Sequence, residues 1–329
     1  MQEMDDADVD EQIKDDIVRN LGYADGSRGK LIPFSYLGGK YKHLNWLLPL
    51  LPQTKSYVEP YGGSGVVLLN RDPVDVETFN DKYGEVVTFF RAVRDSPREL
   101  LQEITLTPYS EAEFDTAVTR TEEMSDVERA RRFFMVVNGS YDNNLNSPNW
   151  SYDVKHSSRG VSKKISSYQA KLRRLMPIAD RLTDVQIANK DAIDVIERFD
   201  SPKTLIYCDP PYPSVTREFP DAYVSDMTDA DHREMAQTLR DCDADVAVSS
   251  YHSSLYDELF VDHGWQRIDA SETSLSASPS SGSGSTRTES LYVNYTITDT
   301  MYNRAFDDDT SRRQQKTQSQ DTPTLSAYQ

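Results

Sequence analysis

The stretch of residues 204–212 constrains the fold of this chain most. Residues 204–208, Thr-Leu-Ile-Tyr-Cys, form an apolar, β-rich segment that is typical of a buried parallel strand. The segment runs into Asp209, Pro210, Pro211 and Tyr212. The two prolines stop the strand and hold the backbone extended without an N–H group to satisfy. A strand of this kind predicts an open α/β sheet, which binds ligands in the crevice at the carboxyl ends of its strands.

The residues after this strand suit an amino group on a flat ring. The Asp209 carboxylate and the Pro210 carbonyl are two acceptors that face the crevice, and Tyr212 adds an aromatic face beside them. An exocyclic NH2 group has two donors and belongs to a base that can stack, so it matches these groups. The alternative is a proline turn that only ends the strand. Taken alone, the four residues leave both interpretations open.

A glycine-rich turn forms a second motif. Residues 56–59 are predicted to be a short strand, and the apolar residues 66–69 follow the turn. The turn itself contains Pro60, Gly62, Gly63 and Gly65. Glycines let the backbone turn tightly and approach a ligand at the start of a helix, although the spacing is not the dinucleotide pattern GxGxxG. Glu59 before the turn would repel a phosphate and favours a cationic or amino-bearing ligand such as S-adenosylmethionine.

An acidic residue follows the second expected strand. Residues 74–79 are predicted to form that strand, and Asn80 and Asp81 come directly after it. In folds of this type, an acidic residue at this point is the usual partner of ribose hydroxyls. Asp81 could instead form a turn before the amphipathic stretch 85–93.

Five motifs occur in an order that resembles one family. FSYLGGK at residues 34–40 is similar to its N-terminal aromatic-x-Gly-Gly-Lys motif, EPYGGSG at 59–65 to its cofactor loop, and DPPY at 209–212 to its catalytic motif. VSSY and LYDEL within residues 248–259 resemble a later strand and helix, and RTESLYVNY at 287–295 resembles the closing strand. On these motifs, from about residue 34 to residue 295, the chain resembles the Dam-type N6-adenine DNA methyltransferases.

The resemblance implies S-adenosylmethionine as the methyl donor. The implied cofactor contacts are Tyr36, Gly39, Lys40, Glu59, Pro60, Gly62, Gly63, Gly65, Asp81, Asp191 and Asp209. The family usually has an aromatic residue after the Asp191 position, but here Ala192 follows, which puts a stacking contact with the cofactor's adenine in doubt. Tyr36 could instead be a core aromatic, Lys40 could start a helix expected over residues 41–51, and Asp191 could be a helix cap.

The resemblance also implies that Asp209, Pro210, Pro211 and Tyr212 are catalytic. The amino lone pair of adenine is delocalised into its ring, so it must be aimed at the sulfonium methyl. Two acceptors can hold both N6 hydrogens and direct the lone pair, an alignment that contributes up to about 7–11 kcal/mol. We expect Asp209 to be ionised and to act as acceptor and field source. Extruding the base costs a few kcal/mol, and stacking on Tyr212, about 1–3 kcal/mol, offsets much of this.

The charge balance is unusual for a DNA-binding protein, because the formal net charge is −18. The chain has 36 Asp against 18 Glu, and 23 Arg against 13 Lys. Many short carboxylates and few lysines indicate a surface adapted to molar salt, as in halophilic archaea or their viruses. Two cysteines in 329 residues exclude a disulfide scaffold and a cysteine-based metal site, and we expect no metal.

One segment is basic against this acidic background. Residues 154–182 contain eight basic residues and one acidic residue, a local net charge of 8 − 1 = +7. Phosphate contacts would use such a cluster, since neutralised phosphates release counterions. At molar salt this gain shrinks, so base-edge and shape contacts should carry more of the affinity. The alternative is a basic helix paired with acidic neighbours inside the protein. The predicted DNA contacts are Lys155, Arg159, Lys163, Lys164, Lys171, Arg173 and Arg174.

The pattern divides the chain into a catalytic domain, an insert and two tails. Residues 30–95 and 185–300 should form an α/β domain with a Rossmann-like, seven-stranded, mostly parallel methyltransferase sheet. Residues 96–184 are mainly helical and should form an inserted target-recognition domain. The acidic residues 1–29 and the polar residues 301–329 are expected to be disordered.

Two loops are candidates for contacts with DNA. An asparagine-rich loop at residues 138–150 contains side chains that could form turns or read base edges, and turn formation is favoured for each. These residues are Asn143, Asn144, Asn146 and Asn149. A serine- and glycine-rich loop at residues 275–288 is expected near the catalytic crevice, where it would order on DNA.

The sequence therefore predicts a site-specific enzyme that methylates N6 of a flipped-out adenine in duplex DNA, as in restriction–modification systems. Without a signal peptide or an apolar run of about 18 residues, we expect no membrane contact and a cytoplasmic location, in the host if viral, as a monomer or as a dimer on DNA. An N4-cytosine enzyme presents the same geometry, but such enzymes more often have Ser in place of the Asp. The motifs also leave open a methyltransferase that acts on RNA or protein, and a non-catalytic DNA-binding relative.

Overall fold

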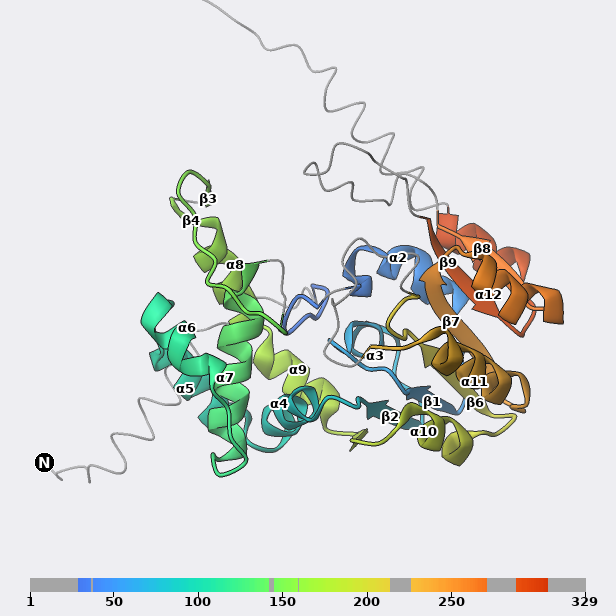
Figure 1. Ribbon diagram of the computed structural model, residues 1–329, viewed down its shortest axis with the longest axis horizontal. Coiled ribbons are helices and arrows are strands. Elements are labelled where there is room, and N and C mark those ends of the chain that lie inside the picture. Colours follow the sequence, from blue (N-terminus) through green and yellow to red (C-terminus); the bar gives the residue numbers. More distant parts are fainter. Residues whose placement is uncertain are drawn as a thin grey trace, which may run out of the picture.

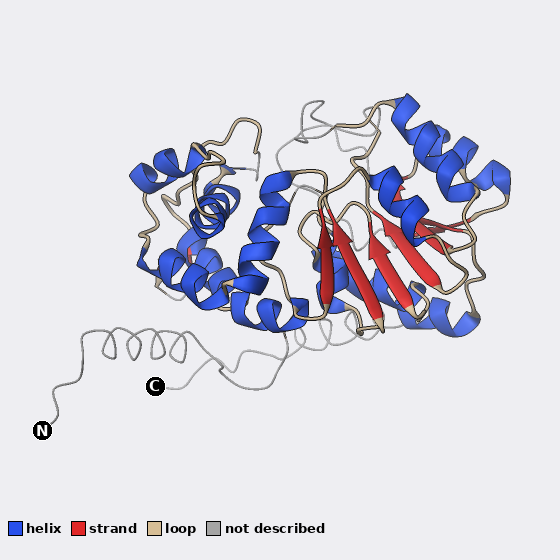
Figure 2. Ribbon diagram, turned by 90° about the horizontal axis from the view of Figure 1, so that it is seen from below, coloured by secondary structure: helices blue, strands red, loops and turns tan. Residues whose placement is uncertain are grey.

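A computed structural model describes residues 29–36, 38–141, 145–158, 160–213, 226–270 and 288–306. The helices of residues 97–182 gather on one side and form what we call the helical lobe (Figure 1). The remaining elements surround a single large sheet and form the sheet lobe (Figures 1 and 2). The predicted tail at 1–29 lies almost entirely outside the described residues, as do residues 307–329, Arg159, Asn143, Asn144 and nearly all of the loop at 275–288. Residues 301–306 are helical and Ala305 is buried, so the disorder predicted from residue 301 is wrong for these six residues.

The sheet has seven strands in the order β5-β2-β1-β6-β7-β9-β8. The strands are β1 (Ser56–Glu59), β2 (Val76–Asn80), β5 (Val185–Ala188), β6 (Thr204–Cys208), β7 (Asp245–Tyr251), β8 (Gln266–Asp269) and β9 (Glu289–Val293). Strands β5, β2, β1, β6 and β7 pair in parallel, and β9 is antiparallel to both β7 and β8. The predicted seven-stranded, mostly parallel sheet is therefore confirmed.

Strand β6 lies at the centre of the sheet and explains the apolar run from which the prediction began. All five of its residues are buried. Leu205 and Tyr207 pack into the core on one face of the sheet, and Ile206 and Cys208 pack into the core on the other face. A strand that is covered on both faces reads as a continuous apolar segment because neither side of it meets water.

Helices cover the two faces of the sheet (Figure 1). The face that carries Tyr207 packs against helices near the chain's start: α2 (Leu44–Leu47), α3 (Val66–Asn70) and α4 (Gly84–Asp95). The face that carries Cys208 packs against α10 (Ala192–Phe199), α11 (Asp229–Arg240) and α12 (Ser254–Leu259). A 3-10 turn, η5 (Val261–His263), follows α12.

The helix expected over residues 41–51 is broken into three short pieces. The 3-10 turns η1 (Lys40–Lys42) and η2 (Leu48–Leu50) flank the single turn of α2. Pro49 lies inside η2. Proline lacks the N–H group that an α-helix needs and clashes with the preceding turn, so a continuous helix cannot pass through it.

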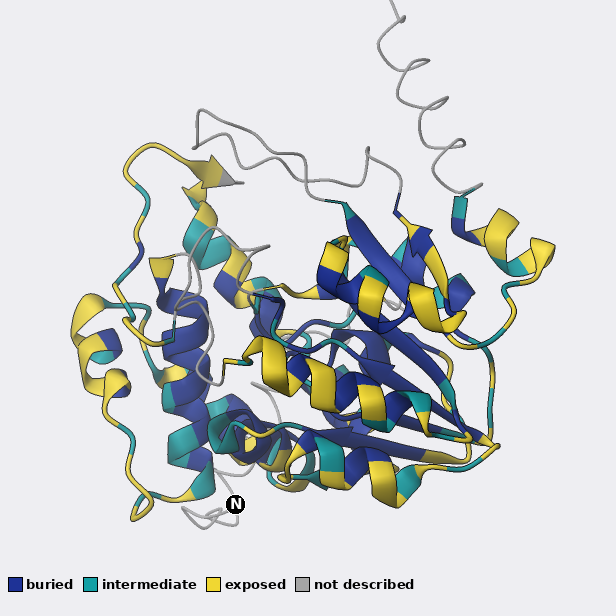
Figure 3. Ribbon diagram, turned by 45° about the vertical axis from the view of Figure 1, so that its right-hand side comes forward, coloured by how far each residue is buried: buried dark blue, intermediate teal, exposed yellow. Residues whose placement is uncertain are grey.

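The helical lobe is built around α7 (Asp126–Gly139), which agrees with the prediction that residues 96–184 are mainly helical. Residues 133–137 are fully buried (Figure 3). The rings of Phe133 and Phe134 pack against Phe89 of α4, so this lobe shares its core with the sheet lobe. Its other elements are α5 (Pro97–Leu106), α6 (Glu111–Val118), β3 (Ser157–Ser158), β4 (Val161–Ser162), α8 (Lys163–Leu172) and α9 (Leu175–Leu182).

Among the described residues, none of the helices has the length and apolar character required to cross a membrane.

Candidate active site

The strand order reverses between β1 and β6, and the carboxyl ends of these two strands open into one pocket. Crevices at such reversal points are the usual ligand sites of open α/β sheets. The predicted site residues that line the pocket are Tyr36, Gly39, Lys40, Glu59, Pro60, Gly62, Gly63, Asp81, Asp191, Asp209, Pro210 and Pro211. Gly65 and Tyr212 are not among the lining residues, so the fold brings most of the predicted residues together.

The glycine-rich turn is packed tightly onto β2. A Cβ atom at Gly62 would lie 2.2 Å from the Phe79 ring, so no other residue fits there without displacing the ring. The Gly62 N–H donates to the Asn80 carbonyl at 2.7 Å. Gly65 precedes α3 with a φ of 62°, a left-handed conformation that favours glycine. These two glycines therefore shape the turn, and their contact with the cofactor stays a prediction.

Asp81 ties this turn to the end of β2. Its carboxylate accepts hydrogen bonds from the Gly63 N–H at 2.8 Å and from the Tyr83 N–H at 2.7 Å. Burial raises the pKa of Asp81 to about 6, and the two backbone hydrogen bonds oppose that rise. The interpretation of Asp81 as a turn former is therefore correct, and its contact with ribose hydroxyls stays a prediction.

Asn80 is a site residue that the sequence analysis missed. Its side chain is fully buried and donates to the Pro60 carbonyl at 2.8 Å and to the Lys190 carbonyl at 3.2 Å. Its side-chain oxygen accepts from the Lys190 N–H at 2.9 Å. One asparagine thus joins the ends of β1, β2 and β5. An asparagine at the end of an apolar strand, directly before an acidic residue, was the available signal.

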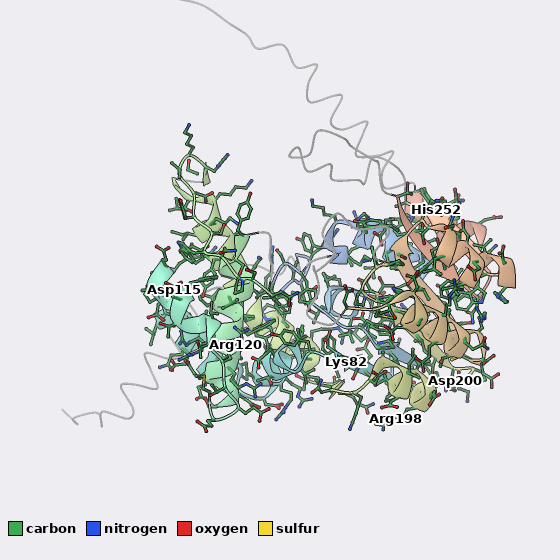
Figure 4. The ribbon with its side chains drawn as sticks, viewed as in Figure 1. Lys82, Asp115, Arg120, Arg198, Asp200 and His252 are labelled. Carbon is green, nitrogen blue, oxygen red and sulfur yellow. The ribbon has the colours of Figure 1, made fainter. Side chains whose placement is uncertain are left out.

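Asp191 caps α10, as the second interpretation of this residue predicts. One carboxylate oxygen accepts from the Ile193 N–H at 3.1 Å, and the other lies 2.9 Å from the Lys82 ammonium. Lys82, in the region between the two lobes in Figure 4, lines the pocket with Asp191. Because the Asp191 side chain is 46% exposed, its carboxylate is open to solvent and to a ligand.

Glu59 differs from the expectation that it carries a charge. It is buried at the end of β1, and the Tyr57 hydroxyl donates to its carboxyl oxygen at 2.6 Å. Burial raises the pKa of Glu59 to about 8, so the side chain is mostly protonated at neutral pH in the ligand-free protein. The repulsion of phosphates that we expected from Glu59 is therefore weak. A cation in the pocket would lower this pKa and restore the charge.

Lys40 is almost fully buried, at 1% exposure. Its ammonium donates to the Asp209 carboxylate at 2.6 Å, to the Tyr212 hydroxyl at 2.6 Å and to the Gly38 carbonyl at 2.8 Å. It starts η1, so its interpretation as the first residue of a helical segment is also correct. The motif predicted a cofactor contact for Lys40, but its ion pair with Asp209 was not predicted.

Asp209 follows β6 at the edge of the pocket and is 21% exposed. Burial raises its pKa to about 6, the Lys40 ammonium opposes this, and the Glu289 carboxylate adds to it. At pH 7 and above the Asp209 side chain is thus mostly ionised in the ligand-free protein. This agrees with the expectation of an acceptor rather than a strong base.

Tyr212 is buried at 2% exposure, which differs from the expected open aromatic face. Its hydroxyl accepts from Lys40 and donates to the Glu289 carboxylate at 2.6 Å, which draws the ring into the protein. The ring also meets the edge of Tyr251, with 4.8 Å between centroids. Stacking of a base on Tyr212 stays a prediction and requires that part of the ring become uncovered.

The basic cluster of the helical lobe divides into exposed and internal residues. Lys155, Lys163 and Arg173 are exposed, and Lys164 and Arg174 are half-buried. Lys171 departs from the predicted DNA contacts, because it is buried between α8 and α7 and donates to Asn138 at 2.7 Å. Burial lowers the pKa of Lys171 to about 8.

Two further predictions can be compared with the described residues. Arg181, counted within the basic segment, forms an ion pair with the buried Glu77 of β2. The alternative of internal pairing is therefore correct for this residue. Asn149 donates to the Ser147 carbonyl at 3.1 Å, as a turn former would.

The composition of the pocket fits S-adenosylmethionine. Its lining has seven acidic side chains, Glu59, Asp81, Asp191, Asp209, Asp226, Asp231 and Glu234, against two lysines, Lys40 and Lys82. Such a lining suits a ligand that carries a sulfonium and an ammonium group together with one carboxylate. In the part of the chain that the structure describes, no group of three or more His, Cys, Asp or Glu side chains is placed to hold a metal ion.

Comparisons with known proteins agree with this geometry. The model of a family described as D12 class N6 adenine-specific DNA methyltransferase matches residues 36–274. The Type II methyltransferase M1.LlaDCHI of Lactococcus lactis subsp. cremoris is 26% identical to the chain over 286 residues. That similarity covers 80% of this chain and 96% of the relative.

Proposed function

The chain belongs to the family of D12 class N6 adenine-specific DNA methyltransferases, and we propose from this premise that Asp209 and the Pro210 carbonyl hold the adenine amino group during transfer. The enzyme methylates adenine in DNA. S-adenosylmethionine, when bound in the pocket between β1 and β6, supplies the electrophilic methyl group. The residues that would hold it are Tyr36, Gly39, Lys40, Gly63, Asp81 and Asp191, together with the half-buried edge of Asp209.

One observation carries the proposal. The Asp209 carboxylate lies at the pocket edge with the Lys40 ammonium 2.6 Å away on its protein side. The lysine fixes the orientation of the Asp209 carboxylate and favours its ionised form. The partial exposure of Asp209 leaves this carboxylate open to a substrate. An ionised Asp209 and the neighbouring Pro210 carbonyl can each accept one N6 hydrogen. The nitrogen lone pair then points away from both acceptors, towards the pocket. There the methyl carbon would leave the sulfur of the donor as the N–C bond forms, and the nitrogen would lose one proton.

We also propose that the helical lobe binds the duplex around the extruded base. Its exposed basic side chains lie just before β3, at the start of α8 and directly after α8, within an otherwise acidic protein. Lys155, Lys163 and Arg173 are the ones most open to phosphates. The similarity to a Type II methyltransferase supports a role in a restriction–modification system.

Two competing functions lose support. The matched family is adenine-specific, which argues against a cytosine enzyme. A non-catalytic relative would have no reason to hold Asp209 between a buried lysine and an open pocket. Cofactor binding without methyl transfer would identify such a protein.

Long-read sequencing of DNA from cells that express this chain tests the proposed function directly. We expect modified adenines at one short recognition sequence, and unmodified adenines in cells that express the Asp209→Ala variant. Modified cytosines, or no modification together with normal cofactor binding, would contradict the proposal. The same data give the recognition sequence.

A further inference from the structure

Two carboxylates, the buried Glu289 and the partly exposed Asp209, share one ammonium group beside the pocket. Lys40 lies 2.6 Å from Asp209 and 3.5 Å from Glu289, and the side chains of Lys40 and Glu289 are almost fully buried. Asp209 has the role described above. Glu289 lies within the closing-strand motif at residues 287–295, but no role was predicted for it and it does not line the pocket. A buried ion pair is weak support for stability, since apolar side chains of similar volume can replace it. Glu289 therefore needs another explanation.

The position of Glu289 follows from the direction of β9. This strand is antiparallel to β7, and its first residue, Glu289, pairs with Tyr251 at the carboxyl end of β7. The closing strand thus starts at the edge of the sheet where Asp209 follows β6. A glutamate at the start of β9 is carried to the catalytic edge by the topology, although it lies 80 residues from Asp209 in the sequence (289 − 209).

The Tyr212 hydroxyl connects the two carboxylates. It accepts from the Lys40 ammonium at 2.6 Å and donates to Glu289 at 2.6 Å. It is also a hydrogen-bonding neighbour of Asp209. A phenol has one proton to donate, so Glu289 and Asp209 compete for it. When the Tyr212 hydroxyl donates its hydrogen bond to Glu289, the lone pairs of Asp209 are left for the amino group of the substrate.

We infer that Glu289 is a positioning residue for methyl transfer. Its buried carboxylate accepts the hydrogen bond of the Tyr212 hydroxyl and holds the Lys40 ammonium in place. These contacts keep Asp209 oriented and open to adenine N6. The inference rests on the proposed role of Asp209. The described titratable groups around the pair are Lys40, Glu59, Tyr207, Cys208, Tyr212 and Tyr256. Of these, Lys40 carries the only positive charge. When the Glu289 charge is removed, the Lys40 ammonium therefore interacts with the Asp209 carboxylate alone.

Glu289→Gln tests the inference because it keeps the side-chain volume and removes the charge. We expect the single-turnover rate at saturating cofactor and DNA to fall by about 10²-fold, the size of effect seen when a catalytic group is slightly misplaced. The affinity for S-adenosylhomocysteine, measured by calorimetry, should change much less. The acid limb of the rate profile should move to lower pH for two reasons. The Glu289 charge, which raises the pKa of Asp209, is gone. The neutral amide is also a weaker acceptor than a carboxylate, so the Tyr212 hydroxyl donates more to Asp209 and lowers its pKa.

Glu77→Gln is the matched control. Glu77 is equally buried and pairs with Arg71 and Arg181, but it lies near the amino end of β2, away from the pocket. Its loss should lower the thermal unfolding midpoint without moving the acid limb.

A second variant tests the proposed connection through the Tyr212 hydroxyl. Adding Tyr212→Phe to Glu289→Gln removes the competing proton and should restore part of the lost rate.

The results separate this inference from the proposed function. If Asp209→Ala abolishes turnover while Glu289→Gln matches the wild-type rate and pH profile, the inference is wrong and the role of Asp209 stands. If Asp209→Ala retains turnover, the proposed role of Asp209 itself fails. A rate loss in Glu289→Gln with an unmoved acid limb and no recovery from Tyr212→Phe would reduce Glu289 to a structural residue.

Discussion

At the scale of single residues, the site depends on one buried cation among carboxyl groups. Lys40 opposes the effect of burial on Asp209, whose pKa is nevertheless raised to about 6. Perturbed groups of this kind cluster where chemistry occurs. The sequence motif named Lys40 and Asp209 as separate cofactor contacts. Their direct pairing, at a separation of 169 residues, was outside the reach of sequence patterns because it needs the tertiary fold.

The pH dependence of activity tests this pairing. The value of kcat/KM reports groups of the free enzyme, so it should rise with pH through a midpoint near 6 as Asp209 ionises. Lys40→Met removes the charge that lowers the pKa of Asp209, so the midpoint should move to higher pH. This shift is opposite to the one expected for Glu289→Gln. A midpoint that stays in place in Lys40→Met would show that another group controls the acid limb.

At the scale of elements, the sequence predicts where buried strands lie, but it predicts only in part which side chains of a helix are buried. The strand at residues 204–208 matches its predicted span, since all five of its residues are buried and form a continuous apolar segment. Strand β8 was not located, because only one of its four residues is buried. The prediction that Lys171 contacts DNA is wrong because it rests on charge alone and not on the position of the residue along the helix. It lies beside Leu172 and one helical turn after Tyr168, both on the buried side of α8.

The two lysines at the start of α8 lead to a prediction about the salt dependence of DNA binding. Changing Lys163 and Lys164 together to alanine should weaken binding to duplex DNA and reduce the slope of log Kd against log salt by about 2, roughly one unit for each lost phosphate contact. Fluorescence anisotropy over a salt series measures both quantities. A double alanine variant at Lys55 and Lys203 is the control, because these exposed lysines lie at the amino ends of β1 and β6 and remove the same charge. Equal slopes in the two double variants would move the DNA-binding face elsewhere.

At the scale of the whole molecule, the fold follows from topology, and the surface charge is an independent property. The reversal between β1 and β6 fixes the pocket, and the insertion between β2 and β5 supplies the helical lobe (Figure 1). This arrangement was predictable because the order of the motifs along the chain determines it. The net charge of −18 is carried mostly by aspartate and does not affect the topology. Adaptation to molar salt stays a prediction.

Thermal unfolding in a KCl series tests that adaptation. Salt shortens the Debye length from about 10 Å at 0.1 M to about 3 Å at 1 M, so repulsion among the excess carboxylates should be screened. We expect the unfolding midpoint to rise steadily into the molar range, and methylation of DNA to persist there. A midpoint that is flat or falls above moderate salt would contradict the prediction.

The most direct test of the account is the rate of methyl transfer by Asp209→Ala, compared with its binding of cofactor and DNA. With radiolabelled methyl donor and a duplex containing the recognition sequence, single-turnover transfer to adenine N6 should fall by about 10³-fold or more, the upper range for loss of one preorganised group. Dissociation constants for S-adenosylhomocysteine and for duplex DNA should change by only a few-fold. Substantial transfer by this variant would contradict the claim that Asp209 holds the amino group.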